Sequence, residues 1–272
     1  MNTNYYHFNV KIISRGQGNS IVASAAYILG EKFRDTYTGT LHDRSYRRDV
    51  IYKRVILPPA APRNFEDPQL LLNSINIAER RRDAQMARSF ILALPHRLPM
   101  KTCESLIEKY IMKNFSNNNM AAIVAIHRGE LDESRKPASI EPVHSRTDNP
   151  HAHILVPFRA LDDTGFQQTK TASRAMNTHD ALISLRENWA NLQNRTFEQL
   201  GLPDRVSNLS LAAQGICRQP TPHLGAAVIS QELRGKQTSR GDMYRDVLEK
   251  NKERNKYRDH LRNREHDREP IR

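Results

Sequence analysis

Two apolar runs that carry histidines at one end constrain the fold of this chain more than any other feature. The first covers residues 120–127 (MAAIVAIH) and the second residues 151–159 (HAHILVPFR). Each is short and almost free of polar residues apart from its histidines, which is typical of a strand buried in a sheet. Because strand side chains alternate between faces, His151 and His153 share one face, roughly 7 Å apart along the strand.

These histidines form a candidate metal site if the two strands pair antiparallel. The end of the first strand then lies beside the start of the second, and His127 becomes a neighbour of His151 and His153. Three neutral imidazoles with open coordination positions suit a divalent transition ion, which can bind a non-bridging phosphate oxygen. The same trio suits zinc in a hydrolase that activates water. A histidine at a strand end is otherwise an ordinary polar residue.

The remaining elements predict an α+β fold, with a mainly antiparallel central sheet and helices on one face of it. Strands are also predicted at 5–13, 50–57 and 87–94, and helices at 21–29, 69–85, 101–115 and 178–200. Asn19 or Ser20 is the expected N-cap of the helix at 21–29, and Gly30 ends that helix. Residues 36–48 are polar and loop-like, and residues 128–150 form a long polar insertion.

The basic charge indicates a polyanionic partner. The formal net charge is +12, which favours nucleic acid first and an acidic membrane surface second, although a generally basic protein has this balance too. No apolar run approaches the roughly 18 residues of a membrane-spanning helix. The N-terminus lacks the features of a signal peptide, so a cytoplasmic protein without membrane insertion is expected. Cys103 and Cys217 are expected to be free thiols.

Composition divides the chain into a domain at 1–224 and a basic extension at 225–272. A last helix is predicted to begin near Gly225. From Lys250 onward the chain is charged and has almost no apolar residues, so this tail is predicted to be either a solvated helix or disordered.

Tyr27, on the short helix that follows the first strand, is the candidate nucleophile. A side-chain hydroxyl that attacks a phosphate gives a covalent enzyme–DNA ester, which a DNA 3′ hydroxyl can later attack to rejoin the strand. An unperturbed tyrosine has a pKa near ~10 and is mostly neutral at neutral pH. On the residues alone Tyr27 is one of nine tyrosines, and a packing aromatic is the simpler interpretation.

Taken together, these residues resemble the MobA/MobL family of plasmid-mobilisation relaxases, which are HUH endonucleases. The most specific match is Asn149-Pro150-His151-Ala152-His153 with the upstream Ile126-His127, and Ser24-Ala25-Ala26-Tyr27 is an independent match. Other matching segments follow in order through the chain: YHFNVKIISR at 6–15, RDAQMAR at 82–88, ALP at 93–95, AQG at 213–215 and PHLG at 222–225.

The resemblance implies Tyr27 as nucleophile and His127, His151 and His153 as metal ligands. It also implies a Rep-like, RRM-like sheet and a divalent ion, Mn²⁺ or Mg²⁺. The implied substrate is single-stranded or supercoiled plasmid DNA at an origin of transfer, nicked with a 5′-phosphotyrosine link. Accessory relaxosome proteins, a type IV coupling protein and a bacterial cytoplasmic location are implied as well.

One departure from the family pattern lies in the strand before Ala93-Leu94-Pro95. Relatives often carry a glutamate there, whereas this chain reads Ser89-Phe90-Ile91-Leu92. In addition, Leu209 replaces a basic residue that is usual in the family. The missing acid leaves open a DNA-binding mobilisation accessory protein with a weakened catalytic site.

Basic residues in three parts of the chain are expected to contact DNA phosphates. They are Lys11, Arg15, Arg80, Arg81, Arg82, Arg234 and Arg240.

Overall fold

A five-stranded sheet organises the computed structural model, which describes residues 6–128, 150–222 and 224–266. The strand order is β1-β5-β7-β6-β4, and every neighbouring pair is antiparallel. The strands are β1 (Phe8–Ser14), β4 (Val50–Ile56), β5 (Gln85–Ala93), β6 (Ala122–His127) and β7 (His151–Pro157). The predicted α+β fold with an antiparallel central sheet is confirmed.

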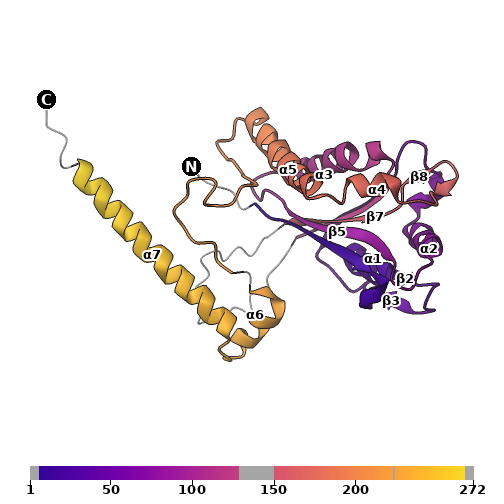
Figure 1. Ribbon diagram of the computed structural model, residues 1–272, viewed down its shortest axis with the longest axis horizontal. Coiled ribbons are helices and arrows are strands. Elements are labelled where there is room, and N and C mark those ends of the chain that lie inside the picture. The colour runs from indigo at the N-terminus through magenta and orange to yellow at the C-terminus, as the bar shows by residue number, and fades with distance from the viewer. Residues whose placement is uncertain (1–5, 129–149, 223, 267–272) are drawn as a thin grey trace. The chain divides into compact units, whose positions relative to one another are not determined.

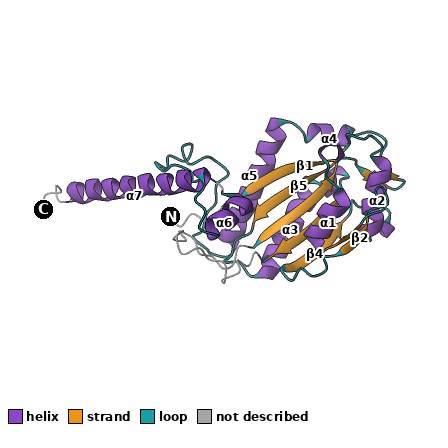
Figure 2. Cartoon of the chain, turned by 90° about the horizontal axis from the view of Figure 1, so that it is seen from below, coloured by secondary structure: helices purple, strands orange, loops and turns teal. Residues whose placement is uncertain are grey.

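Helices cover both faces of this sheet, so the expectation of helices on one face is wrong. α3 (Met100–Asn114) and α5 (His179–Gln199) pack on one face, and α1 (Ile21–Leu29) and α2 (Pro68–Ala78) pack on the other (Figures 1 and 2). The physical reason lies in the central strands: all of β6 is buried. A strand that is apolar on both faces needs a layer on each of them.

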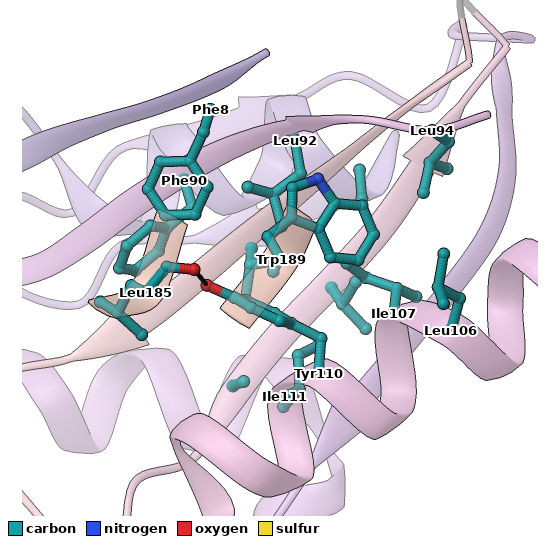
Figure 3. Packing of buried hydrophobic residues seen from close by; sticks show 14 of the residues in the cluster. Phe8, Phe90, Leu92, Leu94, Leu106, Ile107, Tyr110, Ile111, Leu185 and Trp189 are labelled. Carbon is teal, nitrogen blue, oxygen red and sulfur yellow. Dashed lines mark hydrogen bonds between the residues drawn. The ribbon is translucent and has the colours of Figure 1, made fainter. Parts of the chain in front are cut away.

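The face under α3 and α5 holds a core of large aromatic side chains (Figure 3). The rings of Tyr110 and Trp189 meet edge to face with centroids 5.2 Å apart. The Tyr110 hydroxyl donates a hydrogen bond to the Leu185 carbonyl at 3.0 Å. Aromatic pairs of this geometry stabilise a core beyond their buried area, and a buried hydroxyl needs such an acceptor.

The opposite face carries α1, which begins and ends where the sequence predicts. The Ser20 hydroxyl accepts hydrogen bonds from the amides of Val22 and Ala23, each at 3.1 Å, and donates one to Asp35 at 2.7 Å. Ser20, rather than Asn19, is therefore the N-cap. Gly30 ends the helix in the left-handed conformation, at φ 61°.

Two segments differ from the prediction. β2 (Lys32–Arg34) and β3 (Leu41–Asp43) form a hairpin that extends into the segment expected to be loop, and Phe33 is the only buried residue in its two strands. A hairpin with so little apolar alternation leaves no periodic signal in the sequence. α2 ends at Ala78, well before the predicted end at residue 85. Just after Ala78, Arg15 donates hydrogen bonds to the carbonyls of Glu79 and Arg81. That long-range cap cannot be inferred from local propensity.

Short elements follow β7 in the chain: β8 (Leu161–Asp162), β9 (Gly165–Phe166) and α4 (Thr171–Ala175). Short 3₁₀ turns lie before β7, at Arg15–Gln17, Arg63–Glu66 and Ser116–Asn118. The polar insertion predicted at 128–150 lies almost wholly outside the described residues.

A second compact unit contains the described residues from 209 onward, and the first contains 6–128 and 150–208. In the second unit, α6 (Gly225–Leu233) starts where the sequence predicts, and α7 (Ser239–His266) follows it. The buried Glu232 accepts hydrogen bonds from Thr238 and pairs with Arg245 at 2.9 Å. The division at 224/225 stays a prediction. Among the described helices, none has the length and apolar character needed to cross a membrane.

Replacing Ser20 by alanine should destabilise the first unit by about 1–2 kcal/mol, because two helix amides lose their acceptor and the buried Asp35 loses a donor. Urea unfolding followed by circular dichroism measures this change. Ser24→Ala is the matched control, since that hydroxyl only donates back to the Ser20 carbonyl within α1. Equal losses in the two variants would contradict the capping role.

Candidate metal centre

The pairing of β6 with β7 brings the three predicted histidines together. His127 lies directly opposite His151, and Ala125 lies opposite His153. One ring nitrogen from each histidine lies within 4.8 Å of the others. The ring centroids of His127 and His153 are 4.4 Å apart, although the two residues are on different strands. The neighbourhood predicted from strand geometry is therefore present.

A backbone carbonyl sets the tautomer of His127. Its Nε2 lies 2.7 Å from the carbonyl oxygen of Ile28, and this contact requires Nε2 to carry the proton. The lone pair on Nδ1 is the one that a metal ion would bind, and Nη2 of Arg47 lies 3.4 Å from it. The Ile28 contact fixes the ring orientation from behind. Ile28 belongs to α1 and follows Tyr27 directly, so the helix that carries the tyrosine also orients a histidine of the cluster.

Burial favours the uncharged form of His127 and His153. Burial lowers the pKa of His127, and it lowers the pKa of His153 to about 3, with smaller contributions from the neighbouring histidines. Neutral imidazoles are the form that binds metal ions. Three converging nitrogen donors with a hydrogen bond behind one of them fit a divalent transition ion.

Tyr27 lies against this cluster with half of its surface exposed. Its ring centroid is 6.1 Å from that of His127 and 6.2 Å from that of His153, both in edge-to-face geometry. The side chain is 48% exposed, whereas Ala25, Ala26 and Ile28 around it in α1 are buried against the sheet. The amphipathic helix therefore turns Tyr27 away from the core and toward the histidines.

Arg47 and Asp49 also reach the cluster, and the sequence analysis missed both. The Arg47 guanidinium carbon lies 3.9 Å from the centroid of the Tyr27 ring. Arg47 donates to both carboxylate oxygens of Asp49, with 3.0 Å between Nε and Oδ1. The other carboxylate oxygen of Asp49 is 3.8 Å from Nδ1 of His127. Both residues lie just before the strand predicted at 50–57, which is the one sign of them in the sequence. Their position next to the histidines depends on the strand order, which the sequence did not reveal.

The strand in which the family resemblance led us to expect an acid lies beside His153. Ile91 of β5 is directly opposite His153 in the sheet, and Ser89 lies two residues away on the same face. Neither side chain offers a carboxylate. The carboxylate close to the cluster is instead Asp49, at the start of β4 on the far side of β6.

The predicted DNA-binding residues lie in different places. Lys11 is exposed on the same sheet face as His153, since Asn9 is in register with Ile91 and Ile91 with His153. Arg15 is tied to the end of α2 and stacks on Tyr37.

Three other candidates lie at the end of β5 that is away from the histidines. Arg80, Arg81 and Arg82 are exposed just before the start of β5, and Ala93 at the opposite end of that strand pairs with His151. Arg81 forms an ion pair with Asp83. Arg234 and Arg240 are exposed in the second unit.

Comparisons with known proteins place these features in a family. The chain is 28% identical to the Probable mobilization protein MobA of Bifidobacterium longum (strain NCC 2705), over 90% of this chain and 47% of that protein. It is also 28% identical to the Mobilization protein MobL of Acidithiobacillus ferridurans, over 90% of this chain and 68% of that protein. The chain thus spans about half the length of the first relative and two thirds of the second.

The fold is shared with a solved structure described as the molecular basis of vancomycin resistance transfer in Staphylococcus aureus. The two agree with a TM-score of 0.65 and 28% identity, over 76% of this chain and 100% of that chain. The model of the MobA/MobL family matches residues 19–234, which include Tyr27 and all three histidines. The chain therefore belongs to the MobA/MobL family.

Proposed function

We propose that this protein is a relaxase that nicks one strand of plasmid DNA at an origin of transfer, with Tyr27 as the nucleophile. The observation that carries the proposal is the half-exposed Tyr27 ring in edge contact with His127 and His153. A packing aromatic would be buried, whereas this phenol is open to a substrate beside a cluster that fits a metal ion.

The chemistry is a transesterification. A divalent ion, Mn²⁺ or Mg²⁺, held by His127, His151 and His153 would supply positive charge to a non-bridging oxygen of the attacked phosphate. The Tyr27 oxygen bonds to phosphorus as its proton leaves to solvent. The bond from phosphorus to the 3′ oxygen breaks, and that oxygen takes up a proton. The 5′ phosphate stays on Tyr27, and attack by a free 3′ hydroxyl reverses the steps and rejoins the strand.

Basic side chains would hold the DNA through its phosphates. The position of Lys11 on the same sheet face as His153 favours its contact with the strand near Tyr27. Arg80, Arg81, Arg82, Arg234 and Arg240 are exposed and remain candidates for longer-range contacts. Arg15 is a weaker candidate, because its guanidinium already caps α2.

Membership of the MobA/MobL family is our basis for proposing partners and a cellular location. The partners we propose are single-stranded or supercoiled plasmid DNA, accessory relaxosome proteins and a type IV coupling protein, in the bacterial cytoplasm. Residues 1–224 would nick, and the extension at 225–272 would add basic surface.

One alternative has an observation in its favour. A DNA-binding mobilisation accessory protein with a weakened site is suggested by Ser89 and Ile91, which leave β5 without a carboxylate beside His153. This alternative predicts DNA binding without nicking under any divalent ion. An assay for the covalent adduct of the wild-type protein separates the two functions.

Tyr27→Phe should abolish the covalent protein–DNA adduct and leave DNA affinity within about twofold, because only the attacking oxygen is removed. Incubation with supercoiled plasmid carrying the cognate origin and Mn²⁺, followed by an SDS gel, measures the adduct. Tyr46→Phe is the matched control, since Tyr46 is 67% exposed and its hydroxyl accepts a hydrogen bond from Arg44 at 3.2 Å. Nicking without an adduct in both proteins would instead indicate a hydrolase that uses metal-bound water.

His153→Ala should weaken Mn²⁺ binding by about 100-fold or more, because one of three converging donors is lost. Isothermal titration calorimetry on the protein without DNA measures this affinity directly. His179→Ala, at the exposed start of α5, removes a histidine away from the cluster and should leave the affinity unchanged. Equal Mn²⁺ binding by both variants would rule out the metal centre.

The affinity for Mn²⁺ should resist mild acid. Three ordinary histidines with pKa values near 6.5 would lose roughly 1000-fold between about pH 7.5 and about pH 5.5, as protons compete with the ion. The pKa of His153 is lowered to about 3 and that of His127 is lowered too, so both stay neutral further into acid. A loss well below 1000-fold is therefore expected in titrations at the two pH values, and the full loss would contradict the lowered pKa values.

A further inference from the structure

Arg47 connects three parts of the site that come from different elements. Its guanidinium carbon lies 3.9 Å from the centroid of the Tyr27 ring. The same guanidinium forms a two-point pair with Asp49, and its Nη2 lies 3.4 Å from Nδ1 of His127. The Arg47 side chain is only 13% exposed, although it precedes an edge strand.

The Tyr27 ring needs a support on its outer side. Its side chain is 48% exposed on the surface of α1, and the histidines contact it only at ring edges. A half-exposed side chain retains rotamer freedom, and a reaction loses rate when that freedom must be removed in the transition state. A guanidinium stacked on the ring restricts the rotamer, with a favourable cation–π interaction of about 0.5–2 kcal/mol.

Arg47 can serve as this support because it is itself held in place. Asp49 fixes the guanidinium plane, and the Asp49 carbonyl accepts a hydrogen bond from the Arg128 amide at 2.8 Å, just beyond His127. Gly30 provides the space: a Cβ on this glycine would come within 3.4 Å of Cβ of Arg47 and 3.0 Å of Val50. The end of α1 therefore packs closely against Cβ of Arg47 and against Val50 at the start of β4.

We propose that Arg47, oriented by Asp49, is a positioning residue that holds the Tyr27 ring over the histidine cluster for attack on phosphorus. This inference rests on the proposed nicking function. A positioning role predicts a loss in the rate of adduct formation at saturating DNA, with little change in DNA affinity. Affinity for Mn²⁺ should stay equal or rise, since a cation 3.4 Å from a ligand nitrogen is removed.

The kinetic test compares Arg47→Ala, Arg47→Lys and Asp49→Asn in single-turnover adduct formation with saturating single-stranded origin DNA and Mn²⁺. Arg47→Ala should be slower by about 10- to 100-fold. The rate of Arg47→Lys should lie between those of Arg47→Ala and the wild type, because lysine keeps the charge but lacks the planar guanidinium. Asp49→Asn should fall between the wild type and Arg47→Ala. Low concentrations of added guanidinium should recover part of the Arg47→Ala rate.

Arg48→Ala is the matched control. It removes the same charge from the next residue, which is exposed and forms no ion pair within the described part of the chain. Its adduct rate should stay within about threefold of the wild type. Equal losses of rate in the two alanine variants would mean that Arg47 acts only by attracting DNA through its charge, and this result would overturn the inference. A fall in Mn²⁺ affinity on Arg47→Ala would also overturn it, by indicating collapse of the whole site.

A second measurement needs neither DNA nor metal. With 3-fluorotyrosine placed at position 27, the ¹⁹F resonance should be displaced from that of free fluorotyrosine, and Arg47→Ala should move it toward the free value. The same label at Tyr37, which stacks on Arg15 at the same 3.9 Å, should not respond to Arg47→Ala. An unchanged Tyr27 resonance would overturn the positioning role.

The two experiments separate failure of this inference from failure of the proposed function. A wild-type protein that never forms an adduct overturns the proposed function, and with it any role of Arg47 in nicking. A wild-type adduct that forms equally fast in Arg47→Ala overturns the inference alone.

Discussion

The antiparallel register of β6 against β7 is the constraint on which the rest of the site depends. It sets His127 directly opposite His151 and thereby brings His153 within reach of both. A shift of one residue would turn the histidines of one strand to the opposite face. The register is held by burial, because every residue of β6 is enclosed between two helical layers. The aromatic core under α3 and α5 therefore supports the site although it lies on the other face of the sheet.

The helix α1 couples Tyr27 to the histidine cluster through its backbone. Its Ile28 carbonyl accepts a hydrogen bond from His127 while the neighbouring Tyr27 points outward. The N-cap at Ser20 and the left-handed Gly30 determine where the helix starts and stops, so they also determine where Tyr27 falls on it. A contact made by the main chain keeps the ring of a candidate ligand oriented without an additional polar side chain.

The charged side chains beside the histidines, Arg47 and Asp49, come from the segment just before β4 and were not predicted from the sequence. β5 offers Ser89 and Ile91 without a carboxylate beside His153, and the carboxylate near His127 belongs to Asp49 just before β4. Asp49 is already paired with Arg47, so the site contains a cation and an anion side by side next to the histidines. Burial lowers the pKa of His127 and of His153 and favours their neutral form, which suits them to bind a metal ion.

The sequence by itself determined the local features: the strands with their alternating histidines, the capped helix that carries Tyr27, and the basic charge. Each depends on residues close together in the chain, whose periodicity and capping preferences are readable. Only the tertiary structure decided that both sheet faces are covered, that Arg15 ends α2, and that Arg47 lies on Tyr27. These depend on strand order and on side chains that meet across long sequence separations. No local pattern encodes that Val50 of β4 pairs with His127 of β6 and so brings Arg47 to Tyr27.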